Sequence, residues 1–209
     1  MVEQMPSNQL DDTREKLLSA ARNQFAERGF FGASIALIAG EVGLTKQALL
    51  YHFKRKEDLY NEVLRGIAER LIASIQDADD PSKSSEQRFE DMVLKMYRVA
   101  IESPIDNKIL MRELLDNHRK DAPPEQWFFK NWLDQMVAML EAVDGQADLP
   151  FADKVARVFL LVSAIQFFKA SRTVLTRYYG EEMYGEIADH YPKELIALVR
   201  RLLANKGDQ

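Results

Sequence analysis

Four side chains near position 50 are of the types that read DNA base pairs. A helix beginning at residue 46 would bring them to one face, because they form two pairs spaced four residues apart. They are Lys46, Gln47, Leu50 and Tyr51. A glutamine amide can pair with adenine through two hydrogen bonds, a lysine can reach guanine or a phosphate, and an apolar group can contact the thymine methyl. The spacing therefore indicates a face suited to the major groove.

That face needs a second helix to position it, and the sequence predicts one immediately before it. Apolar residues recur on one side of the segment 34–42, and Gly43 then allows a sharp turn. In the next segment, 45–53, Leu49 and Phe53 lie on the inward side. Helix, turn and helix form the helix-turn-helix geometry, in which the second helix enters the major groove. The same pattern also fits two ordinary packed helices whose outer face is solvated.

Three consecutive cations, Lys54, Arg55 and Lys56, stand at the start of another predicted helix. The positive end of the helix dipole makes each of them unfavourable by about 0.3–1 kcal/mol. A phosphate bound at the helix N-terminus would reverse that interaction. The net charge of the chain is −5, but residues 1–56 hold 8 basic and 6 acidic residues, whereas residues 57–209 hold 20 and 27. An acidic protein with one basic segment can bind a polyanion there.

Residues 13–64 resemble the DNA-binding domain of the TetR family of bacterial transcriptional regulators. The resemblance runs without a gap through Phe25-Ala-Glu-Arg-Gly29-Phe30, Ala33-Ser34-Ile35, Ile38-Ala39, Val42-Gly43-Leu44-Thr45-Lys46 and Leu49-Leu50-Tyr51-His52-Phe53-Lys54-Arg55-Lys56-Glu57-Asp58-Leu59. It implies DNA contacts through the residues that match Ser34, Thr45, Lys46, Gln47, Tyr51, His52 and Lys56. Leu50, Lys54 and Arg55 complete the predicted contact set.

Three of these residues depart from the usual pattern of the family. Leu50 stands where tyrosine is usual, so a phenolic contact to phosphate is missing. Arg55 replaces a serine or asparagine cap and adds a cation, and Gln47 replaces glycine or proline and adds a long polar side chain. The DNA sequence that this protein prefers therefore does not transfer from the family.

The helical periodicity and the scarcity of glycine and proline predict an all-α fold. The expected helices cover residues 12–29, 35–42, 46–53, 56–78, 85–102, 105–119, 124–143, 151–178 and 191–205. We expect a flexible tail over 1–10 and a helix-turn-helix DNA-binding domain over 11–56. The resemblance implies that residues 57–209 form a helical ligand-binding and dimerisation domain.

Methionine and aromatic residues are concentrated in this second part of the chain. At helical spacing such residues most often form a core, but they can also line an adaptable apolar cavity. A buried amide or hydroxyl among them needs a partner from the protein or from a ligand. The predicted ligand contacts are Met92, Met96, Tyr97, Met111, Asn117, His118, Trp132, Met136 and Gln166.

The stretch 158–168 is apolar on nearly all sides, which a helix tolerates only when both of its faces are covered. An intrachain core on one face and a partner subunit on the other would cover both. The C-terminal helix has a similarly wide apolar stripe, so the two helices predict a four-helix dimer interface. The predicted interface residues are Val158, Leu161, Ile165, Phe168, Leu195, Leu198 and Leu202.

The composition excludes several kinds of chemistry. The chain has no cysteine, and its three histidines, at 52, 118 and 190, lack metal-ligand spacing. It contains no glycine-rich phosphate loop and no Gly-x-Ser-x-Gly turn, so we expect no enzyme activity, cofactor or metal. The N-terminal sequence is polar and acidic, and the longest nearly apolar run of the chain, residues 158–168, is too short to cross a bilayer. We therefore expect a cytoplasmic protein with no membrane partner.

These observations favour a homodimeric repressor that binds a double-stranded DNA operator and is released by a small, largely apolar or aromatic effector. One alternative within DNA binding is an activator, or a regulator controlled by a protein partner. An alternative of another class is a helical carrier of hydrophobic ligands in which the helix pair is only structural.

Overall fold

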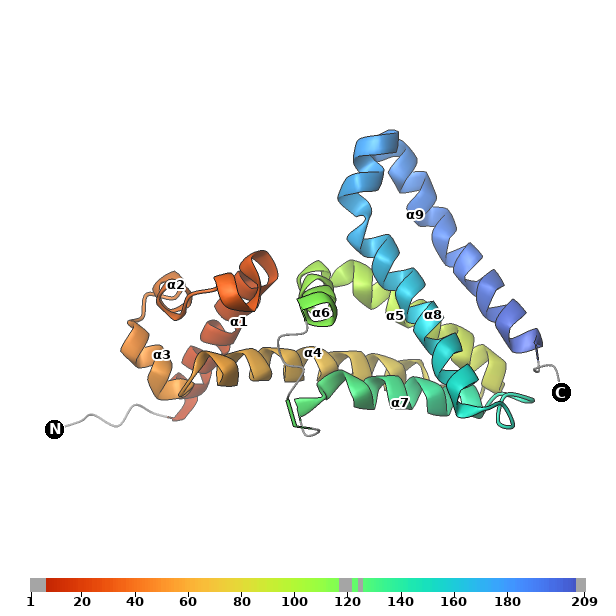
Figure 1. Ribbon diagram of the computed structural model, residues 1–209, viewed down its shortest axis with the longest axis horizontal. Helices are drawn as coiled ribbons and strands as arrows, with labels where there is room; N and C mark the ends of the chain where they lie inside the picture. The colour runs from red at the N-terminus through yellow and green to blue at the C-terminus, as the bar shows by residue number, and fades with distance from the viewer. Residues whose placement is uncertain (1–6, 117–121, 124–125, 206–209) are drawn as a thin grey trace. The chain divides into compact units, whose positions relative to one another are not determined.

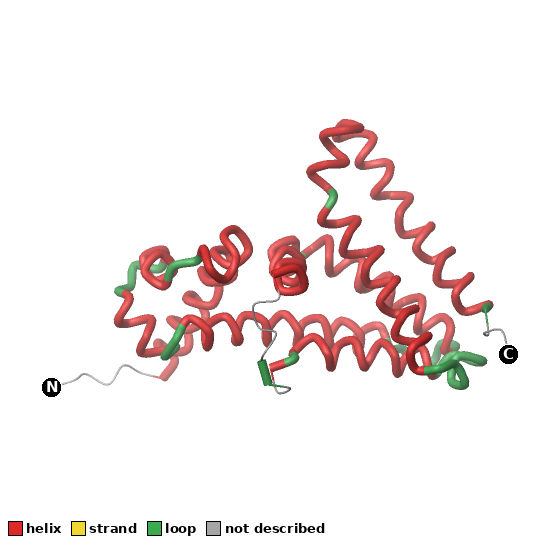
Figure 2. Tube along the Cα trace, in the orientation of Figure 1, coloured by secondary structure: helices red, strands yellow, loops and turns green. Residues whose placement is uncertain are grey.

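Helices form all of the regular secondary structure in the part of the chain that the computed structural model describes, residues 7–116, 122–123 and 126–205 (Figure 2). The all-α prediction is confirmed. In chain order the helices are α1 (Ser7–Gly32), α2 (Ile35–Glu41), α3 (Lys46–His52), α4 (Lys56–Ala78), α5 (Ser85–Glu102), α6 (Pro104–Asp116), α7 (Phe128–Glu141), α8 (Phe151–Ala170) and α9 (Arg172–Ala204) (Figure 1).

The chain divides into two compact units. The first contains residues 1–67 and 108–122, and the second contains residues 68–107 and 123–209. Two helices, α4 and α6, contribute residues to both units. The functional boundary predicted after residue 56 falls at the start of α4, whereas the first unit extends to residue 67.

Helix α1 begins earlier than expected and changes direction near its end. It begins at Ser7, so residues 7–10, expected in a flexible tail, are helical. At Gly29 the backbone has a φ of 69°, which separates a last short turn from the main helix. Glycine occupies this left-handed conformation without the steric cost of a Cβ atom.

The core of the first unit holds α2 and α3 against the helices on either side of them. Leu17, Phe25 and Ile38 are almost completely buried, as are Leu49 and Leu59. These side chains come from α1, α2, α3 and α4, so one apolar cluster fixes four helices. Because α2 and α3 have only seven residues each, tertiary packing rather than helix propensity must stabilise them.

In the second unit α5 is the central helix, since it contacts α7, α8 and α9. The Ser84 hydroxyl caps α5 by accepting a hydrogen bond from the backbone N–H of Gln87, and the Gln87 side-chain oxygen accepts one from the backbone N–H of Ser84. Two methionines of α5, Met92 and Met96, are buried, as is Met136 of α7. The soft thioethers at these positions suit an irregular interior.

The last two helices differ from the sequence prediction. Helix α8 ends at Ala170 instead of residue 178, and α9 begins at Arg172 instead of residue 191. Pro192, expected at the start of the last helix, lies in the interior of α9. Proline has no N–H, so it cannot bond the carbonyl four residues earlier. The Tyr97 hydroxyl donates to that carbonyl, on Ala188, at 3.0 Å. A residue of α5 therefore supplies the hydrogen bond that Pro192 cannot make.

No single helix in the described ranges is long and apolar enough to cross a membrane. Helices α8 and α9 pass that test only as a pair bent by 63°, and by length and composition alone.

The C-terminus of α9 is fixed by two polar side chains. The Arg157 guanidinium donates to the carbonyls of Leu202 and Asn205, at 2.7 and 2.8 Å. It also donates to the side-chain oxygen of Gln146 at 2.6 Å, and the Gln146 amide in turn donates to the Leu203 carbonyl at 2.9 Å. The last carbonyls of a helix have no partner within the helix. Arg157 and Gln146 therefore replace the missing turn and attach α9 to α8.

We expect Arg157→Met to lower the free energy of unfolding by about 1–3 kcal/mol, because three acceptors lose a donor in a partly buried place. Urea unfolding followed by circular dichroism measures the change. Arg201→Met, on the exposed side of α9, is the matched control. Equal urea midpoints for the two variants would contradict this role.

Candidate nucleic-acid interface

The turn between α2 and α3 is built from local signals in the sequence. Gly43 has a φ of 71°, and the Leu44 amide donates to the Ala39 carbonyl at 2.9 Å. Thr45 then caps α3, since its hydroxyl accepts from the Ala48 amide at 3.2 Å. Ser34 is the N-cap residue of α2 and has extended backbone, but its side chain makes no capping bond in the described structure.

The outer face of α3 carries the side chains expected to read bases. Lys46 and Gln47 are exposed, and Tyr51 is 78% exposed. Leu50 and His52 are half-buried. The opposite side of the helix is anchored by Leu49 at zero exposure. Helix α3 is therefore fixed by its buried side and exposes polar groups and one phenol on the other. The contact of these groups with DNA stays a prediction.

The three cations that follow α3 are not equivalent, which the sequence analysis did not foresee. The Arg55 guanidinium lies 3.0 Å from the Asp58 carboxylate, and this hydrogen bond raises the pKa of Arg55. The Lys56 ammonium lies 4.7 Å from the centre of the Phe30 ring, and its partial burial lowers the pKa of Lys56. Lys54 is exposed and has no ion-pair partner among the described residues. Asp58, three residues after Arg55 and so on the same helix face, was the signal in the sequence for this pairing.

A residue of α6 completes the first unit and was not predicted. The Arg112 guanidinium donates to the carbonyls of Ala26 and Glu27 in α1, at 3.1 and 3.0 Å. A Cβ atom at Gly29 would lie only 3.1 Å from an Arg112 nitrogen. One helix further along the chain is thus bound to the end of the main part of α1. No local pattern in the sequence marks this contact.

The predicted ligand residues have separate locations. Those buried in the second unit are Met92, Met96, Tyr97, Trp132, Met136 and Gln166. Met111 is half-buried in the part of α6 that belongs to the first unit. Asn117 and His118 lie outside the described residues.

Two of these buried residues have a polar atom without a hydrogen-bond partner in the described structure. They are Trp132, through Nε1, and Gln166, through Oε1. Asn107, which the sequence analysis did not select, has a buried Oδ1 in the same state. By contrast, the Tyr97 hydroxyl is already bonded to Ala188, and burial raises the pKa of Tyr97 to about 12. An unbonded buried polar atom is unfavourable, so these three sites each lack a partner that a ligand or water could supply.

Most of the predicted dimer residues are buried within the protomer, and their contact with a second subunit stays a prediction. These buried residues are Val158, Leu161, Ile165, Phe168 and Leu195. Phe168, for example, stacks on Tyr191 with 3.8 Å between ring centres. Leu198 and Leu202 are half-buried. The composition of α8 showed that both faces are apolar but could not show which face the chain itself covers.

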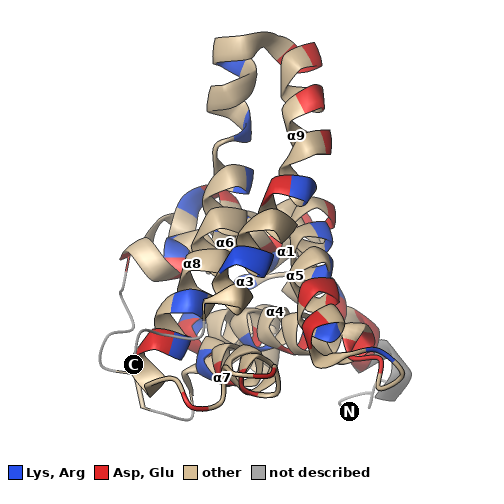
Figure 3. Ribbon diagram, turned by 90° about the vertical axis from the view of Figure 1, so that its right-hand side faces the viewer, with Lys and Arg blue, Asp and Glu red and all other residues tan. Residues whose placement is uncertain are grey.

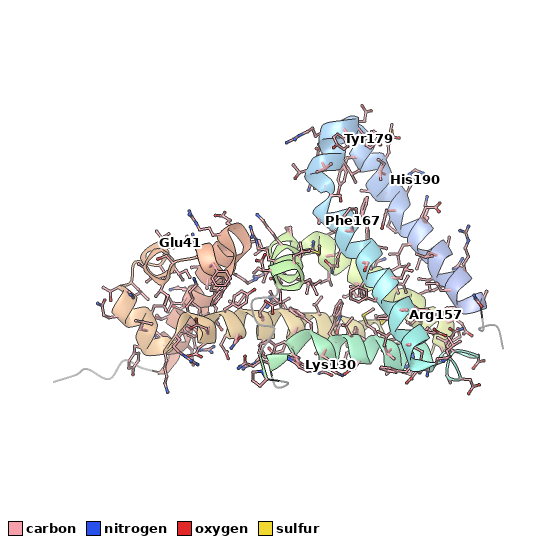
Figure 4. All side chains as sticks on the ribbon, in the orientation of Figure 1. Glu41, Lys130, Arg157, Phe167, Tyr179 and His190 are labelled. Atoms are coloured by element: carbon pink, nitrogen blue, oxygen red, sulfur yellow. The ribbon has the colours of Figure 1, made fainter. Side chains whose placement is uncertain are left out.

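The exposed apolar face of α8 consists of other residues. They are Phe151, Val155, Phe159, Leu160 and Phe167. Phe167 is 71% exposed, and Figure 4 shows it on helix α8, in the hairpin that α8 forms with α9.

Comparison with known proteins relates the first unit to bacterial regulators. Residues 17–63 match the sequence pattern of a family described as bacterial regulatory proteins, tetR family. The transcriptional repressor KstR2 of Mycobacterium tuberculosis H37Rv is 31% identical over 91 residues, which are 44% of this chain and 46% of that protein. The transcriptional regulator RutR of Escherichia coli K12 is 40% identical over 63 residues, 30% of either chain. The chain thus spans less than half the length of these curated relatives.

Solved structures extend the similarity of fold over the whole chain. A TetR-like transcriptional regulator from Rhodococcus sp. RHA1 gives a TM-score of 0.70 at 20% identity, covering 97% of this chain and 100% of that one. The ketosteroid transcriptional regulator KstR2 of Mycobacterium tuberculosis gives 0.65 at 21% identity, covering 93% and 95%.

We expect Lys54→Ala and Arg55→Ala to differ in the salt dependence of binding to duplex DNA. Each phosphate contact contributes about 0.9 to the slope of log affinity against log salt. Lys54→Ala should reduce the slope by about one unit, whereas Arg55→Ala should reduce it less, because Asp58 already pairs with Arg55. Titrations of one DNA duplex at several salt concentrations measure both slopes. An equal reduction would show that the Arg55–Asp58 pair opens on DNA.

Proposed function

We propose that the protein is a homodimeric transcriptional regulator, a repressor released from its operator by a small, largely apolar effector. The proposal is supported by the match of residues 17–63 to the tetR family of bacterial regulatory proteins. The observation that carries the proposal is the exposed face of α3, held by the buried Leu49 and capped by Thr45. A recognition helix contributes specificity only when its side chains are held at a fixed angle to the groove.

The roles of the relatives support the choice of repressor but do not decide it. KstR2 is named a repressor, and a relative from Mycolicibacterium smegmatis, FasR, 32% identical over 83 residues, is named an activator. Both roles use the same kind of DNA-binding domain. We propose repression because KstR2 and a further relative, AcnR of Corynebacterium efficiens, 26% identical over 132 residues, are both named repressors.

The second unit supports the proposal of an effector. Its interior combines methionine and aromatic side chains with polar atoms that have no hydrogen-bond partner among the described residues, including those on Asn107, Trp132 and Gln166. Pockets for small molecules are mostly apolar, with a few polar groups that fix orientation. An effector with a carbonyl and a hydroxyl group would satisfy an indole N–H and an amide oxygen.

Helix α6 offers a route from effector to DNA. Its first residues belong to the second unit, where Asp106 accepts from Arg70 at 2.9 Å. Its later residues belong to the first unit, where Arg112 binds α1 and Glu113 accepts from Tyr60 at 3.0 Å. An effector that binds one position of α6 better than another would shift the population of α1 positions, and with it the affinity for DNA.

DNA binding is tested with the full chain and a library of random duplexes at low salt. We expect one enriched sequence with two related half-sites, because a symmetric dimer reads a near-palindrome. Gln47→Ala should then lose about 1–3 kcal/mol on that sequence, at particular base pairs, and little on scrambled DNA.

Equal losses on both DNAs would remove Gln47 from base reading. Absence of any binding at low salt, where electrostatic attraction is strongest, would instead favour a carrier of hydrophobic ligands.

The unbonded side-chain oxygen of Gln166 allows a test of the proposed effector site without an identified ligand. We expect Gln166→Leu to leave the free energy of unfolding unchanged or to raise it by about 1 kcal/mol, since it removes an unbonded buried oxygen. Gln146→Leu is the matched control with the opposite sign, because Gln146 is fully buried and bonded through both amide atoms. Urea unfolding compares the two. Equal destabilisation would show that Gln166 is a structural amide.

A further inference from the structure

The end of the α8–α9 hairpin separates its charges by sign. We call residues 169–190 the apical hairpin. Its first limb, up to residue 179, holds three cations and no acid, and its second limb, from residue 181, holds four acids and no lysine or arginine. They are Lys169, Arg172 and Arg177 against Glu181, Glu182, Glu186 and Asp189. Figure 3 shows blue on one limb of the projecting hairpin and red on the other.

The backbone places the division at the bend. Gly180 has a φ of 85° and interrupts the helical geometry of α9 between the two limbs. The guanidinium of Arg172 reaches across to the Glu181 carboxylate at 3.1 Å, which ties the limbs together within one chain. Two oppositely charged helices therefore lie beside each other at the apex.

Three of these charges are free to pair with a partner. Arg177, Glu182 and Glu186 are exposed and have no ion-pair partner among the described residues. Large apolar side chains are exposed between them, with Tyr178 at 71% and Tyr179, at the apex in Figure 4, at 60% exposure. Exposed aromatic residues surrounded by charge are typical of protein–protein contact surfaces.

Helix dipoles account for only part of this pattern. A cation in the last turn of the first limb and acids in the first turn of the second limb are favourable for each limb alone. That applies to Arg177, Glu181 and Glu182. It also applies to Lys169, which lies in the last turn of α8. The effect fades within one turn, so it does not account for Glu186 or Asp189.

We propose that the apical hairpin docks against the apical hairpin of a second copy of this chain, with the cationic limb of each copy facing the acidic limb of the other. The proposal rests on the homodimer proposed above and adds the register that charge imposes on it. In a two-fold contact each surface meets its own copy, so a hairpin with one positive and one negative limb is complementary to itself. The reverse arrangement would place like charges together, at a large electrostatic cost.

The location of the apical hairpin also favours a second copy of this chain as its docking partner. It continues the exposed apolar face of α8, which ends at Phe167, two residues before the first cation. Apolar residues along α8 would supply the area of the contact, and the apical charges would select its orientation.

Two variants of the full-length chain test the proposal. The first, Thr173→Glu with Arg177→Glu, neutralises the cationic limb, and the second, Glu182→Lys with Glu186→Lys, neutralises the acidic limb. Each variant loses the charge attraction in both contacts of its own homodimer. We expect the dimer dissociation constant of each to rise about tenfold, measured by sedimentation velocity. Arg98→Glu and Glu69→Lys, exposed charge reversals on α5 and α4, should leave it unchanged.

Mixing the two variants is the decisive measurement. A mixed dimer keeps one full contact, between the cationic limb of the second variant and the acidic limb of the first. Mixed dimers should therefore exceed the half expected from random pairing, and added salt should remove the excess. Random pairing, or two variants that dimerise as the wild type does, would overturn the proposal. Circular dichroism verifies folding, and Arg177→Gln and Glu182→Gln replace any variant that fails it.

A third variant separates this proposal from the proposed function. Phe167→Glu should disrupt the apolar face of α8 and dissociate the dimer whether or not the apical hairpins meet. If it does so while the charge variants behave as the wild type, the apical contact is wrong and the homodimer stands. If the wild type is a monomer that still enriches a DNA sequence, the apical contact and the homodimer both fall and DNA binding remains.

Discussion

The arrangement of the first unit depends on keeping a seven-residue helix in place. Helix α3 is too short to be stable in water by itself, because the unfavourable free energy of helix nucleation exceeds the favourable free energy of two helical turns. Its position comes from Leu49, buried at zero exposure, and from the turn at Gly43 that sets it against α2. The buried inner side of α3 therefore stabilises the helix, and the exposed outer side is free to carry polar residues.

The sequence predicted this part of the molecule well, because its signals are local. The Thr45 cap and the Gly43 turn each act over a few residues, so α2 and α3 could be placed almost to the residue. The interactions of the three cations after α3 were harder to predict. Whether Lys56 lies over the Phe30 ring depends on how α1 ends, 26 positions earlier, and periodicity carries no information on that.

The second unit shows where a single sequence gives too little information. Both faces of α8 are apolar, so burial of Ile165 and exposure of Phe167 could not be distinguished before the tertiary packing was known. Proline usually predicts a helix boundary, as at Pro192, yet the free carbonyl of Ala188 accepts a hydrogen bond from Tyr97, 91 positions away. Long-range hydrogen bonds of this kind override a local rule, and only the fold reveals them.

The division of charge at Gly180 also has a consequence for the cell that makes this protein. Two solved regulators with a similar fold, at 20% and 17% identity to this chain, come from one bacterium, Rhodococcus sp. RHA1, so similar helices can compete for partners within one cell. Apolar faces discriminate poorly among such partners, whereas a fixed pattern of signs penalises every mismatched pair. In the apical contact proposed above, residues of the second unit would decide which subunits pair, and exchange of a few charges at the apex would separate the product of a duplicated gene from its parent.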